Sequence, residues 1–463
     1  MKKIILSFFF FLIFITNFYG QDVTGQWNGL LKFPGGQLTL VINITATENG
    51  YSATMDSPDQ DVTDMPVKTI TFKDNKLDFF IPEASIHYTG ILENNIITGT
   101  FKQGNSPMPL NLSREKTKRS RPQEPKQPYP YHSEDITFKN EKAGITLAGT
   151  LTLPKKEGSF PAVILISGSG AQNRDSETLG HKPFLVLADH LTKNGIAVLR
   201  FDDRGTAKSE GNFGKSTSED FATDVEAGID YLKQRKEVNK KRIGIIGHSE
   251  GGMIAPMVAS KNNDVNFIVL LAGTGIPGDE ILLLQTYLVG KTSGMPETEL
   301  EKLKDINKSL YNVVKTETDN TAIKEKLKTV GANKLKPHFL SKNIPENQID
   351  QIIEMQIADL SSPWTQFFIR YNPAAALEKT KCPVLAINGS NDLQVPAKEN
   401  LAAIKKALDK AKNKNVTIVE LQGLNHLFQQ STTGAPSEYG EIEETFSPVA
   451  LNEISDWIKK QIK

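Results

Sequence analysis

The chain has 463 residues, of which 38% are hydrophobic, so it is long and apolar enough for the cores of two or three domains. Lys and Arg together number 54, as do Asp and Glu, and the formal net charge is therefore zero. A chain without a net electrostatic field is not drawn to polyanions. We expect neither a nucleic-acid partner nor binding to an anionic membrane surface.

The first twenty residues indicate export from the cytoplasm. Two lysines precede an apolar run from Ile4 to Ile15, and short polar and small residues follow as far as Gly20. A run of this length is too short to cross a bilayer, so residues 1–20 are typical of a cleaved signal peptide. We therefore expect a periplasmic or secreted protein without a membrane span after signal cleavage. Cys382 is the only cysteine, which excludes an intramolecular disulfide.

Residues 21–113 predict a small all-β domain. Apolar residues alternate with others, as in the stretch from Leu38 to Ile44, and this alternation is typical of an antiparallel barrel or sandwich. The turn-forming pairs between these stretches are Asn49-Gly50, Asp74-Asn75 and Asn94-Asn95. The sequence GQW at residues 25–27 is similar to the first strand of lipocalin-like barrels. We expect Trp27 to lie in the core rather than to contact a ligand.

Residues 114–132 are rich in proline and lysine and have no apolar period, which predicts a semi-extended linker. From residue 133 to 463, apolar strand-like runs alternate with helical segments. This pattern predicts a mostly parallel sheet with helices on both of its faces.

An insertion at about residues 278–372 interrupts this alternation. It is too long for a loop, and its apolar residues have helical spacing, so we expect a helical cap. Because the insertion enters and leaves between two strands, it should lie over the strand ends and form a pocket wall. We expect Trp364 and Phe367 to lie either in the core or in this wall.

Ser249 lies in the sequence GHSEGG, between an apolar strand-like run and an apolar helix. Strand, tight turn and helix are the setting of a nucleophile elbow, in which the serine backbone is strained and only glycine fits at the flanking positions. Gly247, Gly251 and Gly252 are placed to give that clearance. The alternative interpretation is an ordinary serine that caps the helix.

His426 and Asp392 are the candidate partners of Ser249. A serine hydroxyl needs a base, the base needs an acid to orient it, and in this arrangement the chain order is serine, acid, histidine. Asp392 and His426 each follow a predicted strand, in that order. The alternatives are an Asx turn for Asp392 and a surface imidazole for His426. Glu399 and Glu420 are weaker acids, because one lies in a helix and the other within a strand.

Two backbone N–H groups are expected to bind the oxyanion of the reaction. One belongs to Glu250, directly after Ser249, and the other to Ser169 in the loop that follows an earlier strand. The alternative for the loop of Ser169 is a Gly/Ser-rich turn without a catalytic role. The acidic pair in FDDRG, residues 201–205, is expected to hold its loop through an ion pair. The sequence contains no HExxH motif and no cysteine pair, so we predict no metal site and no cofactor.

These motifs resemble those of the α/β-hydrolases, and the resemblance covers residues 133–463. The motifs that carry it are, in chain order, ISGSG, FDDRG, GHSEGG, NGSNDLQVP and LNHLF. The chain is most similar to bacterial serine esterases and serine aminopeptidase-like hydrolases. The resemblance implies an α/β-hydrolase fold with the catalytic triad Ser249, Asp392 and His426.

The sequence therefore predicts an exported serine hydrolase, a carboxylesterase that cleaves small or medium acyl esters through an acyl-enzyme. Its predicted partner is a small-molecule ester, and the sequence carries no signal for an oligomeric state. One alternative is a serine peptidase or aminopeptidase, since the same triad cleaves amides. Another is a non-catalytic protein whose β-domain binds a ligand, with the hydrolase fold as a scaffold.

Overall fold

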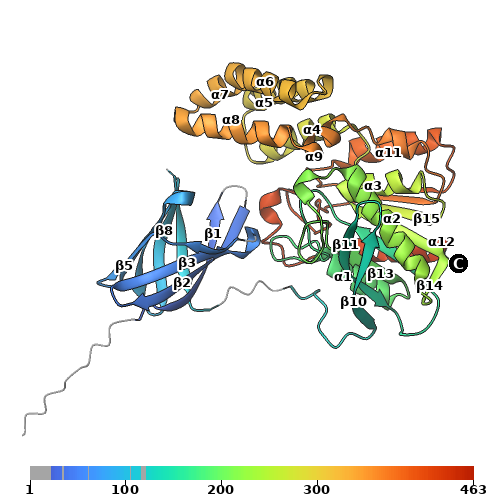
Figure 1. Cartoon of the computed structure of the whole chain (residues 1–463), viewed down its shortest axis with the longest axis horizontal. Helices are drawn as coiled ribbons and strands as arrows, with labels where there is room; N and C mark the ends of the chain where they lie inside the picture. The colour runs from blue at the N-terminus through green and yellow to red at the C-terminus, as the bar shows by residue number, and fades with distance from the viewer. Residues whose placement is uncertain (1–21, 34–35, 61, 105, 116–120) are drawn as a thin grey trace, which may run out of the picture. The chain divides into compact units, whose positions relative to one another are not determined.

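The computed structural model of the chain describes residues 22–463, except 34–35, 61, 105 and 116–120. The predicted signal peptide, residues 1–20, lies outside the described residues. The chain forms two compact units that part between residues 118 and 119. Each unit has its own sheet and its own core (Figure 1).

The N-terminal unit is one antiparallel sheet that curls into a half-barrel, with the strand order β4-β3-β2-β1-β9-β8-β7-β6-β5. Its strands are β1 (Gly25–Phe33), β2 (Gly36–Thr47), β3 (Gly50–Ser57), β4 (Val62–Pro66), β5 (Thr69–Lys73), β6 (Lys76–Ile81), β7 (Ile86–Glu93), β8 (Ile96–Gln103) and β9 (Ser106–Ser113). Between β4 and β5, the Val67 N–H donates to a carbonyl of β3 and the Lys68 N–H to a carbonyl of β6, each at 3.0 Å. The unit is thus a single curled sheet and not a two-sheet sandwich.

Aromatic side chains fill the interior of this half-barrel. Trp27, Phe79, Tyr88 and Phe101 are each at most 2% exposed. The Trp27 indole N–H donates to the Val23 carbonyl at 2.7 Å, which satisfies its polar atom. The expectation that Trp27 lies in the core is confirmed.

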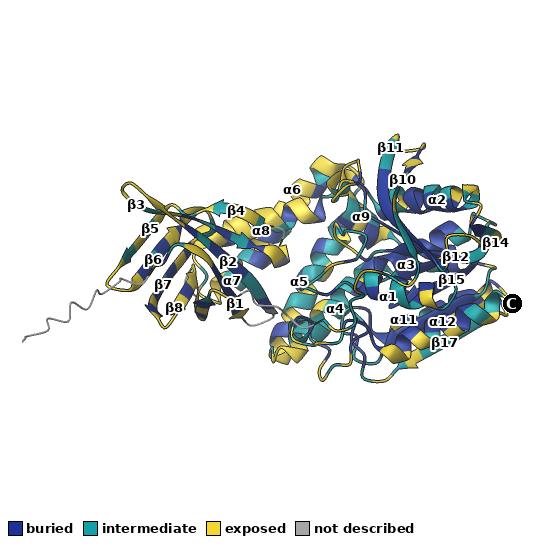
Figure 2. Ribbon diagram, turned by 90° about the horizontal axis from the view of Figure 1, so that it is seen from below, coloured by how far each residue is buried: buried dark blue, intermediate teal, exposed yellow. Residues whose placement is uncertain are grey.

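The C-terminal unit is built on an eight-stranded sheet with the order β10-β11-β13-β12-β14-β15-β16-β17. Its strands are β10 (His132–Asn140), β11 (Ile145–Leu153), β12 (Phe160–Ile166), β13 (Ala197–Phe201), β14 (Val238–His248), β15 (Val265–Leu271), β16 (Val384–Gly389) and β17 (Val416–Leu421). The pairs that β11 makes with β10 and β13 are antiparallel, and the other pairs are parallel. Its central strands are largely buried, as their continuous apolar sequences require (Figure 2).

Helices cover both faces of this sheet, as an α/β-hydrolase requires. One face packs against α1 (Pro183–Lys193) and α12 (Pro448–Gln461). The other packs against α2 (Ser218–Gln234), α3 (Glu250–Ala259), α10 (Ala374–Leu377) and α11 (Ala397–Lys410). The predicted fold class, an α/β-hydrolase unit preceded by an all-β domain, is confirmed.

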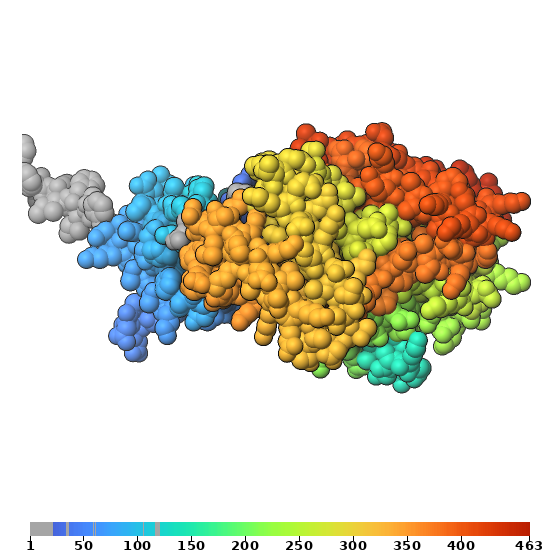
Figure 3. All heavy atoms as spheres, turned by 90° about the horizontal axis from the view of Figure 1, so that it is seen from above, coloured from blue at the N-terminus to red at the C-terminus, as the bar shows by residue number. Residues whose placement is uncertain are grey.

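The insertion between β15 and β16 is a helical cap with a core of its own. Its helices are α4 (Gly278–Thr292), α5 (Glu297–Thr316), α6 (Asn320–Val330), α7 (Lys336–Leu340), α8 (Glu346–Leu360) and α9 (Pro363–Arg370). Leu310, Val314, Leu327 and Ile349 are fully buried within it. At its base the Gly278 N–H donates to the Tyr371 carbonyl at 3.0 Å, so the insertion enters and leaves at one point. Figure 3 shows the cap, coloured yellow to orange, over one face of the hydrolase unit.

The second half of the predicted linker is fixed to the hydrolase unit. The Arg121 guanidinium donates to the carbonyls of Ile442 and Gly440, at 2.8 and 3.1 Å. The Gln123 side chain donates to the Phe446 carbonyl at 2.7 Å and accepts the Thr445 N–H at 2.6 Å. The prediction of a linker as far as residue 132 was therefore wrong in this part. Side chains bonded to backbone hold this segment, and such bonds leave no apolar period in the sequence.

Removal of residues 119–130 should destabilise the hydrolase unit. A chain that begins at Tyr131 lacks the hydrogen bonds of Arg121 and Gln123, each worth about 1 kcal/mol. We expect its Tm to lie roughly 5 °C or more below that of a chain that begins at residue 119, as measured by calorimetry. Equal Tm values for the two chains would show that this segment adds nothing to stability.

Candidate active site

The three predicted triad residues follow strands β14, β16 and β17, which are three of the last four strands in the sheet order. Ser249 comes directly after β14, Asp392 lies in the loop after β16, and His426 lies in the loop after β17. These strands are parallel, so the three loops lie at the same edge, where α/β sheets bind their ligands. The His426 Nδ1 and Asp392 Oδ2 atoms are 2.8 Å apart, and both residues are at most 5% exposed.

Ser249 has the strained backbone of a nucleophile elbow, with φ 55° and ψ −114°. A Cβ atom at Gly247 would lie 2.0 Å from the Gly251 carbonyl oxygen, and one at Gly251 would lie 2.4 Å from the Ile166 carbonyl oxygen. Glycine is therefore required at both positions. The helix-capping interpretation of Ser249 is wrong, because its side chain makes no capping hydrogen bond to α3.

Asp392 uses its two carboxylate oxygens for different purposes. Oδ1 accepts the backbone N–H groups of Gln394 and Val395, at 2.9 and 2.8 Å, and this closes the loop after β16. Oδ2 is the atom that contacts His426. The Asx-turn alternative is thus correct for one oxygen, and the loop bonds hold the other in place against the imidazole.

His248 supports His426 and was not among the site residues predicted from the sequence. Its ring centroid lies 4.7 Å from that of His426, and its Nε2–H donates to the His426 carbonyl at 2.9 Å. Burial, with a smaller contribution from His426, lowers the pKa of His248 from 6.5 to about 3. His248 is therefore neutral and fixed in one tautomer. Its position next to Ser249 in the GHSEGG motif is the feature of the sequence from which this role could have been predicted.

The neutral state of His248 in the folded chain should lower stability in acid. Between pH 6.5 and about 3 the unfolded chain binds a proton at His248 that the folded chain does not bind. Stability therefore falls as the pH falls through this window, by about 1.4 kcal/mol per pH unit for one proton. We expect His248→Gln to reduce the slope of the unfolding free energy against pH in urea titrations. Identical slopes for wild type and variant would contradict this assignment.

The loop that carries Ser169 lies beside the elbow and is held by Asp203. A Cβ atom at Gly168 would lie 3.2 Å from the Ser249 Cβ. The Ser167 hydroxyl and the Gln172 N–H donate to the two carboxylate oxygens of Asp203, at 2.6 and 2.9 Å. Burial raises the pKa of Asp203 to about 7. Asp203 thus holds the loop of one expected oxyanion donor.

Ion pairs hold the rest of the FDDRG loop, as expected from the sequence. Asp202 pairs with Arg174 and Arg204 pairs with Asp224, each at 2.7 Å. All four side chains are at most 13% exposed. These contacts give the motif a structural role beside the site.

The other expected oxyanion donor is the N–H of Glu250, the first residue of α3. The first N–H groups of a helix have no carbonyl partner within the helix, so they are free to bind an anion. The Glu250 side chain accepts a hydrogen bond from the Trp364 indole of the cap at 2.8 Å. Phe367 instead lines a separate groove with Thr217, Arg370 and neighbouring residues.

An apolar cluster lies where the cap meets the predicted catalytic loops. It consists of Met253 on α3, Ile281 on α4, Phe368 on α9 and Val395 in the acid loop. Each of these side chains is at most 6% exposed. Through Val395, whose N–H bonds to Asp392, this apolar cluster adjoins the loop of the predicted acid.

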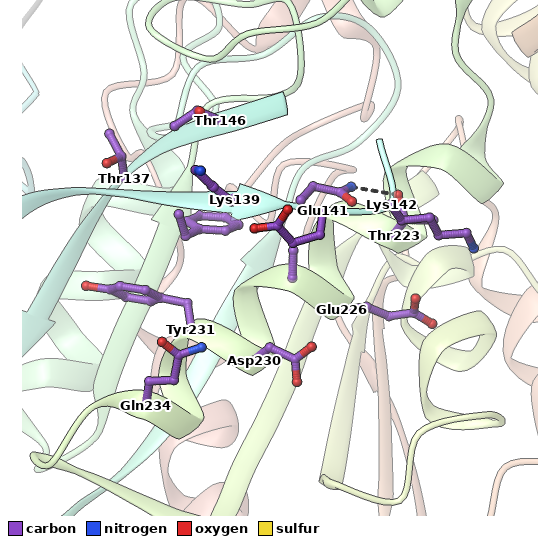
Figure 4. Close-up of a pocket in the computed structure, with 13 residues that line it drawn as sticks. Thr137, Lys139, Glu141, Lys142, Thr146, Thr223, Glu226, Asp230, Tyr231 and Gln234 are labelled. Atoms are coloured by element: carbon purple, nitrogen blue, oxygen red, sulfur yellow. Dashed lines mark hydrogen bonds between the residues drawn. The ribbon is translucent and has the colours of Figure 1, made fainter. Parts of the chain in front are cut away.

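A groove of about 780 Å³ lies elsewhere, between the β10–β11 hairpin and α2 (Figure 4). Lys139, Glu141, Glu226, Asp230 and Tyr231 are among its lining residues, and none of the predicted site residues is. Across the part of the chain that the structure describes, no three His, Cys, Asp or Glu side chains form a group suited to a metal ion. No helix among the same residues is both long and apolar enough to cross a membrane.

The model of the family described as serine aminopeptidase, S33, matches residues 182–430. The chain belongs to this family. This S33-family hydrolase is 28% identical over 340 residues to the esterase EstD of Thermotoga maritima, and the alignment covers 72% of this chain and 69% of EstD. It is 36% identical over 128 residues to the uncharacterized protein PA2218 of Pseudomonas aeruginosa, and this alignment covers 27% of this chain and 32% of PA2218.

Among solved structures, the Pyrococcus furiosus esterase Pf2001 matches the S33-family hydrolase with a TM-score of 0.44 and 18% identity. The match covers 76% of this chain and all of the other. The resemblance to esterases and serine aminopeptidase-like members of the α/β-hydrolases, inferred from five sequence motifs, is confirmed by the family match.

Proposed function

We propose that this hydrolase is a carboxylesterase that cleaves small or medium acyl esters through the triad Ser249, His426 and Asp392. The observation that carries the proposal is the buried contact of 2.8 Å between His426 and Asp392, at the sheet edge that also presents the strained Ser249. The similarity to the esterase EstD supports ester over amide substrates.

In this mechanism Ser249 attacks the ester carbonyl and transfers its proton to Nε2 of His426. Asp392 keeps the Nδ1–H of His426 in place and stabilises the imidazolium. The backbone N–H groups of Glu250 and Ser169 bind the oxyanion. His426 then protonates the leaving alcohol, and a water activated by His426 hydrolyses the acyl-enzyme.

The acyl group is apolar in this proposal, because the cluster of Met253, Ile281, Phe368 and Val395 lies between the cap and the catalytic loops. One methylene in such surroundings is worth about 1 to 3 kcal/mol. Export remains part of the proposal and is supported by the signal-like sequence of residues 1–20. The filled interior of the N-terminal unit speaks against a ligand-binding protein on a silent scaffold.

A substrate panel tests this function. We expect labelling of the mature protein at Ser249 by a fluorophosphonate, and hydrolysis of p-nitrophenyl esters with an optimum between acetyl and hexanoyl. Aminoacyl p-nitroanilides should be cleaved far more slowly. Preference for the anilides would establish the aminopeptidase alternative instead. Absence of labelling in the folded protein would establish a non-catalytic role.

A further inference from the structure

The side chain of Glu250 connects three elements around the candidate active site. It is 2% exposed, and its Oε1 atom accepts the Ser218 hydroxyl of α2 at 2.6 Å and the Trp364 indole N–H of cap helix α9 at 2.8 Å. The Oε2 atom is buried and has no hydrogen-bond partner among the described residues. The backbone N–H of the same residue is the oxyanion donor in the proposed function.

We propose that Trp364 and the Glu250 side chain are positioning residues that couple the cap to the oxyanion hole. Glu250 begins α3, so a displacement of its side chain turns the N–H that follows Ser249. The inference rests on the proposed function, because it concerns the oxyanion donor of that reaction. It assigns the cap a role in the chemical step besides forming the pocket wall.

Both ends of this coupling are held firmly. Trp364 stacks on Phe368 at 5.1 Å between ring centroids, and Phe368 is 6% exposed in the cluster between cap and sheet. At the other end, Glu250 lines a small cavity together with Ser167, Gly168 and Asp203, which belong to the second oxyanion donor's loop or hold it. The Glu250 carboxyl group is therefore the hydrogen-bonded connection between α9 and the elbow, beside the apolar packing of Phe368 in the cluster that includes Met253 of α3.

The carboxyl group acts here as a neutral acceptor. Both donors bind the same oxygen, and a buried carboxylate with an unpaired second oxygen would be costly. Burial raises the pKa of Glu250, which also favours the protonated form. Glutamine keeps the Oε1 acceptor and the neutral charge, and leucine removes both hydrogen bonds without changing the backbone N–H.

The test compares kcat and KM of four variants in the full chain with p-nitrophenyl butyrate. Loss of one oxyanion donor costs about 100-fold or more in kcat, so a misplaced donor in Glu250→Leu should lower kcat about tenfold or more with KM changed less than about threefold. Trp364→Phe, which removes the N–H donor and keeps an aromatic ring beside Phe368, should lower kcat by about threefold to tenfold. Glu250→Gln should stay within about threefold of wild type. Gln366→Ala, on the same helix but with a side chain that bonds to Asn320 and Ser361, is the matched control and should keep the wild-type kcat.

The double variant Glu250→Leu/Trp364→Phe should be no slower than Glu250→Leu, because Trp364 acts through Glu250. Wild-type kcat in both Glu250→Leu and Trp364→Phe would overturn the inference, as would additive losses or a Glu250→Gln variant as slow as Glu250→Leu. Fluorophosphonate labelling separates this failure from that of the proposed function. An unlabelled wild type would reject the function, and a labelled, active wild type with unaffected variants would reject the coupling alone.

Discussion

Replacement of Ser249 by alanine should abolish ester hydrolysis, with a loss of about 1000-fold or more in kcat/KM. Alanine cannot form the acyl-enzyme, and the strained backbone at this position is held by the strand, the helix and the glycines beside it. The Ser249 side chain caps nothing, so the fold should be retained. Initial rates with p-nitrophenyl butyrate, together with Tm, measure both expectations.

Ser260→Ala is the matched control for this variant. Ser260 lies at the other end of α3, and its hydroxyl contacts only the Met257 carbonyl among the described hydrogen bonds. The control should keep wild-type activity, and His426→Ala should be as inactive as Ser249→Ala, because the triad acts as a unit. Activity of Ser249→Ala within tenfold of wild type would reject Ser249 as the nucleophile.

Asp392→Asn should lower kcat by about 10⁴-fold while the chain stays folded. The asparagine carbonyl can still accept the N–H groups of Gln394 and Val395, so the loop after β16 keeps its shape. Its NH₂ group then faces Nδ1 of His426. This contact forces the imidazole proton onto Nε2, and His426 can no longer accept the serine proton.

Glu399→Gln is the matched control for the acid. Glu399 follows the same strand as Asp392, but it is exposed on α11, and we expect unchanged kinetics. The comparison requires only steady-state rates and circular dichroism of both variants. If Glu399→Gln proved inactive and Asp392→Asn active, the acid would be misassigned.

Sequence alone located the predicted triad, because two physical signals coincide at each of its members. The apolar runs before Ser249, Asp392 and His426 mark buried parallel strands, and the chain order follows from how such strands are wound. The glycines of GHSEGG added a steric signal at the elbow. The resulting contact between Asp392 and His426 needed no information beyond these patterns.

The supporting residues could not be predicted in the same way. His248 bonds to a backbone carbonyl, and Glu250 meets an indole 114 residues further along the chain. Neither contact depends on periodicity, since each arises when separately folded parts pack together. The contacts of Arg121 and Gln123 were missed for a related reason. Their acceptors are backbone carbonyls, which every residue has, so no residue type marks these partners in the sequence.

In the N-terminal unit, too, the turns could be predicted from the sequence, whereas the arrangement of the strands could not. The pairs Asp74-Asn75 and Asn94-Asn95 were predicted as hairpin turns, and all four residues have positive φ, as the tight turns of hairpins require. The choice between barrel and sandwich depended on the segment between β4 and β5, where the N–H group of Val67 bonds to β3 and that of Lys68 bonds to β6. No residue type specifies these two backbone contacts.

The base of the cap, where Gly278 and Tyr371 are hydrogen-bonded, makes the insertion an exchangeable module. Its two ends already meet, and the core formed by α5 to α8 is internal, so the length of the chain between these ends has little effect on the hydrolase unit. Helices α5 to α8 can therefore differ in length and sequence at little cost to the sheet, whereas Trp364 and Phe368 on α9 contact the hydrolase unit and must be kept. The substrate range can then change, in evolution or by engineering, while the sheet and the loops that carry the predicted triad stay the same.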